Sequence, residues 1–96
     1  MIYVIDADVK DIETQYVATG CLHKATTDIH KAIQYAHKRI EKSSSHFKVL
    51  SVSITEFSEE DDGEPIDSTT IYLEEYNRGY RFRAINGKIR KRKPKK

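Results

Sequence analysis

One segment of the chain has the spacing of an amphipathic helix, and it restricts how the rest can fold. Its apolar residues recur at intervals of three and four, which places them on one side of a helix: Ile29, Ala32, Ile33, Ala36 and Ile40. Thr26, Thr27 and Asp28 precede it with side-chain oxygens that can cap its first turn, and serines at 43–45 end it. The other patterned segments alternate with a period of two, so this helix must cover a sheet.

The alternating segments predict an antiparallel sheet. They are Ile2–Val9, Thr14–Leu22, Phe47–Phe57, Thr69–Tyr76 and Tyr80–Ile85. The first has apolar residues on both faces and is expected to be central or near-central. In Phe47–Phe57, Leu50, Val52 and Ile54 are expected to face the core, with serine and threonine outside. Asn77–Gly79 predicts a tight turn, and Asn86 with Gly87 gives another turn signal.

These elements predict one α+β domain over residues 1–87, in the order ββαβββ. A single helix should pack on one face of a mostly antiparallel sheet of four to five strands. Residues 58–67 hold six acids with Gly63 and Pro65, and predict an acidic hairpin loop. Residues 88–96 have Ile89 as their only large apolar side chain, so we expect them to form a disordered, flexible basic tail.

Charge is strongly segregated along the chain, although the net charge is only +2. Residues 56–77 carry nine acidic residues and no Lys or Arg, whereas residues 78–96 carry ten basic residues and no acid. Such a division says little about the fold and more about the partners that the protein attracts.

The basic region predicts binding to a nucleic acid or a nucleoprotein. Lys and Arg that neutralise phosphates release counterions, and interleaved Tyr80 and Phe82 could stack on bases. The candidate residues are Arg78, Arg81, Arg83, Lys88, Arg90, Lys91, Arg92, Lys93, Lys95 and Lys96. The alternative is a solvated segment that aids solubility or contacts the protein's own acidic loop.

A second hypothesis is an accessory protein of a phage or mobile element that inhibits a host protein by direct binding. The candidate interface is an exposed strand face with Tyr72, Tyr76 and Tyr80, because tyrosine contributes strongly to interfaces. An open edge strand could also pair two copies, so a homodimer is a further possibility.

Catalytic and metal sites are not predicted, and neither is a cofactor. His30, Gln34, His37 and Glu41 share one polar helix face, but the two histidines are two turns apart, about 10.5 Å, too far for one metal. The acidic loop lacks the acid positions of a calcium-binding loop. Cys21 near His23 is not enough for nucleophilic catalysis. A small metal-independent ribonuclease that uses His, Tyr and Arg groups is the remaining enzymatic alternative.

The sequence therefore predicts a small, non-enzymatic binding module. A lone cysteine and the absence of an apolar run long enough to span a bilayer favour a cytoplasmic protein without a membrane partner. Its basic C-terminal region should dock on a nucleic acid or on a nucleic-acid-handling complex and modulate it.

Overall fold

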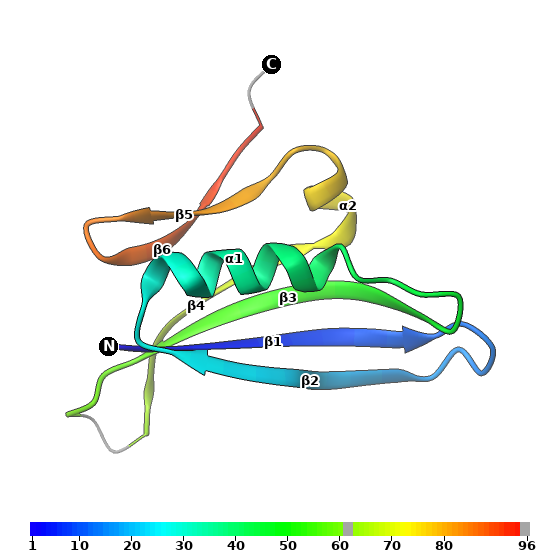
Figure 1. Ribbon diagram of the computed structural model, residues 1–96, viewed down its shortest axis with the longest axis horizontal. Coiled ribbons are helices and arrows are strands. Elements are labelled where there is room, and N and C mark those ends of the chain that lie inside the picture. The colour runs from blue at the N-terminus through cyan, green and yellow to red at the C-terminus, as the bar shows by residue number, and fades with distance from the viewer. Residues whose placement is uncertain (61–62, 95–96) are drawn as a thin grey trace.

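The computed structural model describes residues 1–60 and 63–94. Two antiparallel sheets and two helices make up the fold (Figure 1). In chain order the elements are β1 (Ile2–Asp11), β2 (Val17–Thr26), α1 (Ile29–Ile40), β3 (Phe47–Phe57), β4 (Pro65–Tyr72), α2 (Leu73–Asn77), β5 (Arg81–Ile85) and β6 (Lys88–Arg92).

The larger sheet has the strand order β2-β1-β3-β4, and every neighbouring pair in it is antiparallel. β5 and β6 form a separate hairpin. α1 and this hairpin lie side by side on the same face of the larger sheet, and none of the described elements covers the opposite face (Figure 1). The predicted α+β fold, with one long helix on one face of an antiparallel sheet and the first strand in a central position, is confirmed.

The core lies between the larger sheet and the layer above it. Tyr3, Ile5 and Ala7 of β1 point into this space, because alternate residues of a strand share a face. The other layer buries three residues of α1 and two of the hairpin: Ala32, Ala36, Ile40, Phe82 and Ile89. The core therefore depends on both the helix and the hairpin.

A bulge in β3 changes which of its residues face the core. Asp8 pairs with Ser51 but Val9 pairs with Val49, so Leu50 is an extra residue in the strand. Val49 consequently becomes fully buried, whereas Leu50, predicted to face the core, is only half-buried. Val52 and Ile54 are buried as the alternation predicted.

The helix begins and ends where the sequence indicates. The Asp28 carboxylate accepts hydrogen bonds from the backbone N–H groups of His30 (2.9 Å) and Lys31 (3.2 Å). These bonds lower the pKa of Asp28, the one from Lys31 most, because they stabilise the charged form. Described residues form no helix that is both long and apolar enough to cross a membrane.

The strand predicted over Thr69–Tyr76 is displaced by four residues, because β4 begins at Pro65, inside the acidic loop predicted over residues 58–67. β4 ends at Tyr72, and Leu73–Asn77 form the short helix α2. The Glu75 carboxylate accepts a hydrogen bond from the Tyr72 N–H (3.0 Å), which stabilises the first helical turn. The turn expected at Asn77–Gly79 is the end of this helix, where Gly79 has a φ of +106°.

The boundary predicted for the flexible basic tail is also wrong, because Lys88–Arg92 form β6. Asn86 and Gly87 both have positive φ, as a two-residue hairpin turn requires, and Ile85 pairs with Lys88 across it. Ile89, the only large apolar residue of β6, is fully buried. Lys93 and Pro94 follow the strand, whereas Lys95 and Lys96 lie outside the described residues, as do Asp61 and Asp62 of the predicted acidic loop.

Replacement of Gly79 should destabilise the protein more than replacement of the hairpin glycine. A Cβ at Gly79 would lie 2.8 Å from Cβ of Pro94, whereas one at Gly87 would have no neighbour within 4 Å. Positive φ alone costs an L-residue about 1–2 kcal/mol, so Gly87→Ala should lower the free energy of unfolding by about that amount. Gly79→Ala should lower the free energy of unfolding, measured by urea titration, by more than Gly87→Ala does. Equal losses of stability in the two variants would contradict the close contact with Pro94.

Candidate functional site

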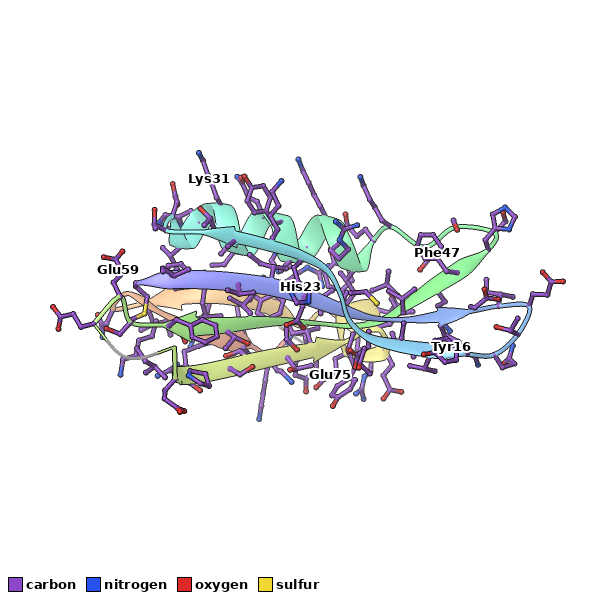
Figure 2. The ribbon with its side chains drawn as sticks, turned by 90° about the horizontal axis from the view of Figure 1, so that it is seen from below. Tyr16, His23, Lys31, Phe47, Glu59 and Glu75 are labelled. Atoms are coloured by element: carbon purple, nitrogen blue, oxygen red, sulfur yellow. The ribbon has the colours of Figure 1, made fainter. Side chains whose placement is uncertain are left out.

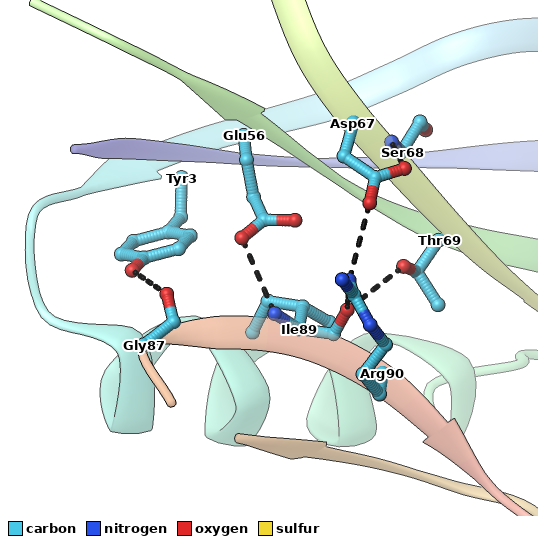
Figure 3. A network of polar contacts seen from close by, with 8 residues as sticks. All are labelled: Tyr3, Glu56, Asp67, Ser68, Thr69, Gly87, Ile89 and Arg90. Atoms are coloured by element: carbon cyan, nitrogen blue, oxygen red, sulfur yellow. Dashed lines mark hydrogen bonds and ion pairs between the residues drawn. The ribbon is translucent and has the colours of Figure 1, made fainter. Parts of the chain in front are cut away.

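Side chains of the larger sheet hold the hairpin through the outer edge of β6 (Figure 3). The Ile89 N–H donates to Oε1 of Glu56 (3.2 Å), and the Ile89 carbonyl accepts from the Thr69 hydroxyl (3.3 Å). The Tyr3 hydroxyl donates to the carbonyl of Gly87 (3.2 Å). The buried Ile89 N–H would otherwise have no partner, and the three side chains together fix the free edge of β6 against the larger sheet.

Glu56 is the central member of this set and is a residue that sequence reasoning missed. It is only 2% exposed, and its Oε2 has no hydrogen-bond partner among the described residues. Burial of the Tyr3 hydroxyl, and secondarily the charge of Glu56, raises the pKa of Tyr3. Glu56 follows Val52 and Ile54 in the inward alternation of β3, and that position was the available signal.

Two cations of the hairpin are neutralised within the protein. Arg90 forms an ion pair with Asp67 (3.1 Å), and Nζ of Lys91 lies 3.0 Å from both carboxylate oxygens of Glu75. The pKa of Glu75 is lowered, most by the hydrogen bond from the Tyr72 N–H and then by the hydrogen bond and charge of Lys91, because these contacts stabilise the carboxylate. The suggestion that the basic segment contacts the protein's own acidic residues is thus correct for Arg90, because Asp67 belongs to the predicted acidic loop.

A cluster around His37 joins the hairpin to α1. Nε2 of His37 accepts a hydrogen bond from the Phe82 N–H (3.0 Å), and its ring packs against the rings of Tyr76 and Phe82. The Tyr76 hydroxyl donates to Glu41. Of the polar residues that share one face of α1, His37 is thus half-buried against β5 and α2, whereas Glu41 contacts Tyr76 of α2 and stays exposed.

Arg81 completes this cluster instead of facing solvent. Its guanidinium lies 3.8 Å from the centroid of the Tyr76 ring and donates to the carbonyls of Tyr76 and Tyr80. Burial, and secondarily the charge of Arg81, lowers the pKa of His37. A neutral imidazole is what the bond from Phe82 requires, because a protonated Nε2 could not accept it.

The three tyrosines proposed as a protein interface do not share a strand face. Tyr72 ends β4 and is 54% exposed, Tyr76 lies in α2, and Tyr80 precedes β5. Tyr76 and Tyr80 are half-buried, and both pack against the core. The structure therefore leaves only Tyr72 of the three with a largely exposed ring.

The outward face of the hairpin collects the remaining cations. Phe82 and Ile89 point inward, so the alternate positions Arg83, Lys88 and Arg92 point to solvent, and all three are exposed. We call these three residues the outer cations. Arg83 is directly opposite Arg90, with Lys88 and Arg92 as its diagonal neighbours on β6, about 7–8 Å away.

This surface has an excess of like charge with little internal compensation. Arg81 pairs across the hairpin with Arg92, and like charges in that position destabilise a sheet. No ion pair involves the outer cations within residues 1–60 and 63–94. Lys93 and Arg78 add two more exposed cations nearby in sequence. A shallow groove of about 500 Å³ lies along the hairpin, lined by Arg83, Ile85, Asn86, Lys88, Arg90 and Lys91.

The structure places the metal-binding and nucleophilic candidates of the sequence as follows. The described part of the chain has no group of three His, Cys, Asp or Glu side chains that could hold a metal ion. Cys21 is a free thiol that contacts the Thr19 carbonyl, and the His23 imidazole contacts the Gly20 carbonyl. Both candidates thus make local backbone contacts.

Comparisons with known proteins found no matching family model, no similar curated protein and no similar solved structure. The description of this site therefore depends on its geometry alone.

Acid should destabilise the protein partly through His37. Because its pKa is lowered in the folded state, the unfolded chain takes up this proton more readily as the pH falls through the ordinary value of 6.5. The contribution of neutral His37 is complete above that pH and is lost below it.

His37→Gln is the variant that tests this prediction, because its amide oxygen can still accept from the Phe82 N–H. Between about pH 7.5 and pH 5.5, the wild-type free energy of unfolding should fall more steeply than that of the variant. The other histidines are present in both proteins and cancel in the comparison. Parallel curves would contradict the role of His37.

Proposed function

We propose that this protein is a small binding module that docks on nucleic acid through the outward face of the β5–β6 hairpin and contributes no chemistry of its own. The observation that carries the proposal is the division of the hairpin's charge. Arg90 and Lys91 pair with Asp67 and Glu75, whereas the outer cations face solvent. A polyanion would relieve their mutual repulsion.

The form of the hairpin supports this proposal. A two-stranded ribbon can enter the major groove of B-DNA, and Lys and Arg contacts to phosphates supply most of a protein's sequence-independent affinity. Buried Phe82 and Ile89 fix the ribbon on its inner side, so its cations are held in a defined spacing. Little conformational entropy would be lost from the backbone on binding.

The other hypotheses receive less support. A host-protein interface would need the tyrosines, but Tyr76 is engaged with Glu41 and Arg81. A ribonuclease that used His37 for proton transfer would need its Nε2, yet this atom accepts a hydrogen bond from the Phe82 N–H. We propose a cytoplasmic setting, in which the protein would modulate a nucleic acid or a complex that handles one.

The double variant Arg83→Gln, Arg92→Gln tests the proposal. Each contacted phosphate contributes about 0.9 to the slope of log affinity against log salt on B-DNA, so the slope should fall by about 1.8. Fluorescence anisotropy with labelled single- and double-stranded DNA and RNA would measure it. Point variants are preferable to deletion from Lys88, because that deletion would remove β6 and the buried Ile89.

The matched control is Lys10→Gln, Lys48→Gln. This pair removes the same charge from paired positions of β1 and β3, far along the sheet from the hairpin turn. Neither double variant should lower the free energy of unfolding. Equal losses of slope in the two variants, or no wild-type binding at low salt, would contradict the proposal.

A further inference from the structure

A second basic surface, on the other flank of α1, was not apparent from the sequence. We define it as the Tyr35 pocket, a hollow of about 100 Å³ between α1 and β2 that is lined by Lys24, Tyr35, Lys38, Arg39 and Lys42. α1 runs along one long side of the molecule, where its long side chains, Lys31 among them, point outward (Figure 2). The lining has four cations and no acid.

Two separate elements bring these residues together. On α1 and just beyond it, Lys38, Arg39 and Lys42 follow Tyr35 at i+3, i+4 and i+7, so they share its flank. Lys24 comes from β2, where it pairs with buried Ile5 and therefore stands on the face of the sheet that carries α1. Its Nζ lies 3.9 Å from the centroid of the Tyr35 ring.

The helix dipole does not account for the whole cluster. Cations in the last turn stabilise a helix, which explains Lys38 and Arg39. Lys24, however, belongs to a strand, and Lys42 lies beyond the last helical residue, Ile40. None of the four cations forms an ion pair within the described ranges. The acid nearest in sequence, Glu41, instead accepts from Tyr76 on the opposite flank.

From this arrangement we infer that the Tyr35 pocket binds a backbone phosphate of the nucleic acid that the hairpin contacts, so that the protein has two phosphate-binding surfaces, one on each flank of α1. The inference rests on the proposed function. Four unpaired cations complement a phosphate, and an aromatic ring among them is typical of surfaces that contact nucleic-acid strands. The hairpin reaches α1 through His37, so α1 separates the two surfaces.

The test is the salt dependence of binding for Lys38→Gln, Lys42→Gln, again compared with Lys10→Gln, Lys48→Gln. Two duplexes would be used, of about 24 and about 6 base pairs, which at 3.4 Å per base pair are about 80 Å and about 20 Å long. The molecule measures 43 × 37 × 17 Å, so only the longer duplex spans it. Circular dichroism and urea unfolding would show that each variant keeps the fold.

On the long duplex the Lys38→Gln, Lys42→Gln variant should lose up to about 0.9 of the salt slope, the contribution of one phosphate, and the control should lose none. On the short duplex the loss should be no larger, because a shorter ligand presents fewer phosphates to the two surfaces. A long-duplex slope equal to that of the control overturns the Tyr35 pocket alone, provided that Arg83→Gln, Arg92→Gln still weakens binding. Failure of the wild-type protein to bind either duplex overturns both this inference and the proposed function.

Competition with inorganic phosphate provides a second test. At matched ionic strength phosphate should displace the long duplex more effectively from the wild-type protein than from Lys38→Gln, Lys42→Gln, since it competes for the pocket. If chloride and phosphate act alike on both proteins, the surface is only a diffuse positive field, and the inference of a phosphate pocket is wrong.

Discussion

The hydrogen bond between the buried Glu56 carboxylate and the Ile89 N–H is the contact on which the second layer of this fold depends. A carboxylate that is 2% exposed is costly unless it is paired, and here one of its oxygens bonds to the edge of β6. The hairpin in turn covers the part of the sheet that α1 leaves open (Figure 1). Docking of β6 on the sheet therefore also buries Glu56.

Docking of the hairpin also determines which cations of the C-terminal region have an acidic partner. Acidic side chains from β4 and α2 contact Arg90 and Lys91, and the inward face of the hairpin goes to the core. The outer cations have no acidic partner in the described structure, although Arg90, which lies opposite Arg83, is paired with Asp67. The hairpin therefore carries two paired cations, Arg90 and Lys91, and three exposed cations without an acidic partner.

The elements whose apolar residues follow a regular period could be predicted from the sequence. Elements whose position depends on a few individual contacts could not. α1 and β3 have the expected bounds, because their patterns are long and their ends are marked. β6 was missed, since one apolar residue among lysines and arginines gives no period, and its stability comes from Glu56 and Thr69 in distant strands. For the same reason the sequence could name the candidate cations only as a group and could not separate Arg81 and Lys91 from Arg83 and Arg92. The Tyr35 pocket joins residues of β2 and α1, which only the strand register brings together.

The larger sheet has two inner and two outer strands, and this arrangement has a consequence for its internal motions. The described elements that pack on the sheet, α1 and the hairpin, lie on one of its faces (Figure 1). Amide protons in β1 and β3 are then shielded by strand pairing on both sides, whereas β2 and β4 each have one open edge. Hydrogen exchange should therefore be slowest in the two inner strands, and the outer strands should open through local fluctuations that leave the rest folded.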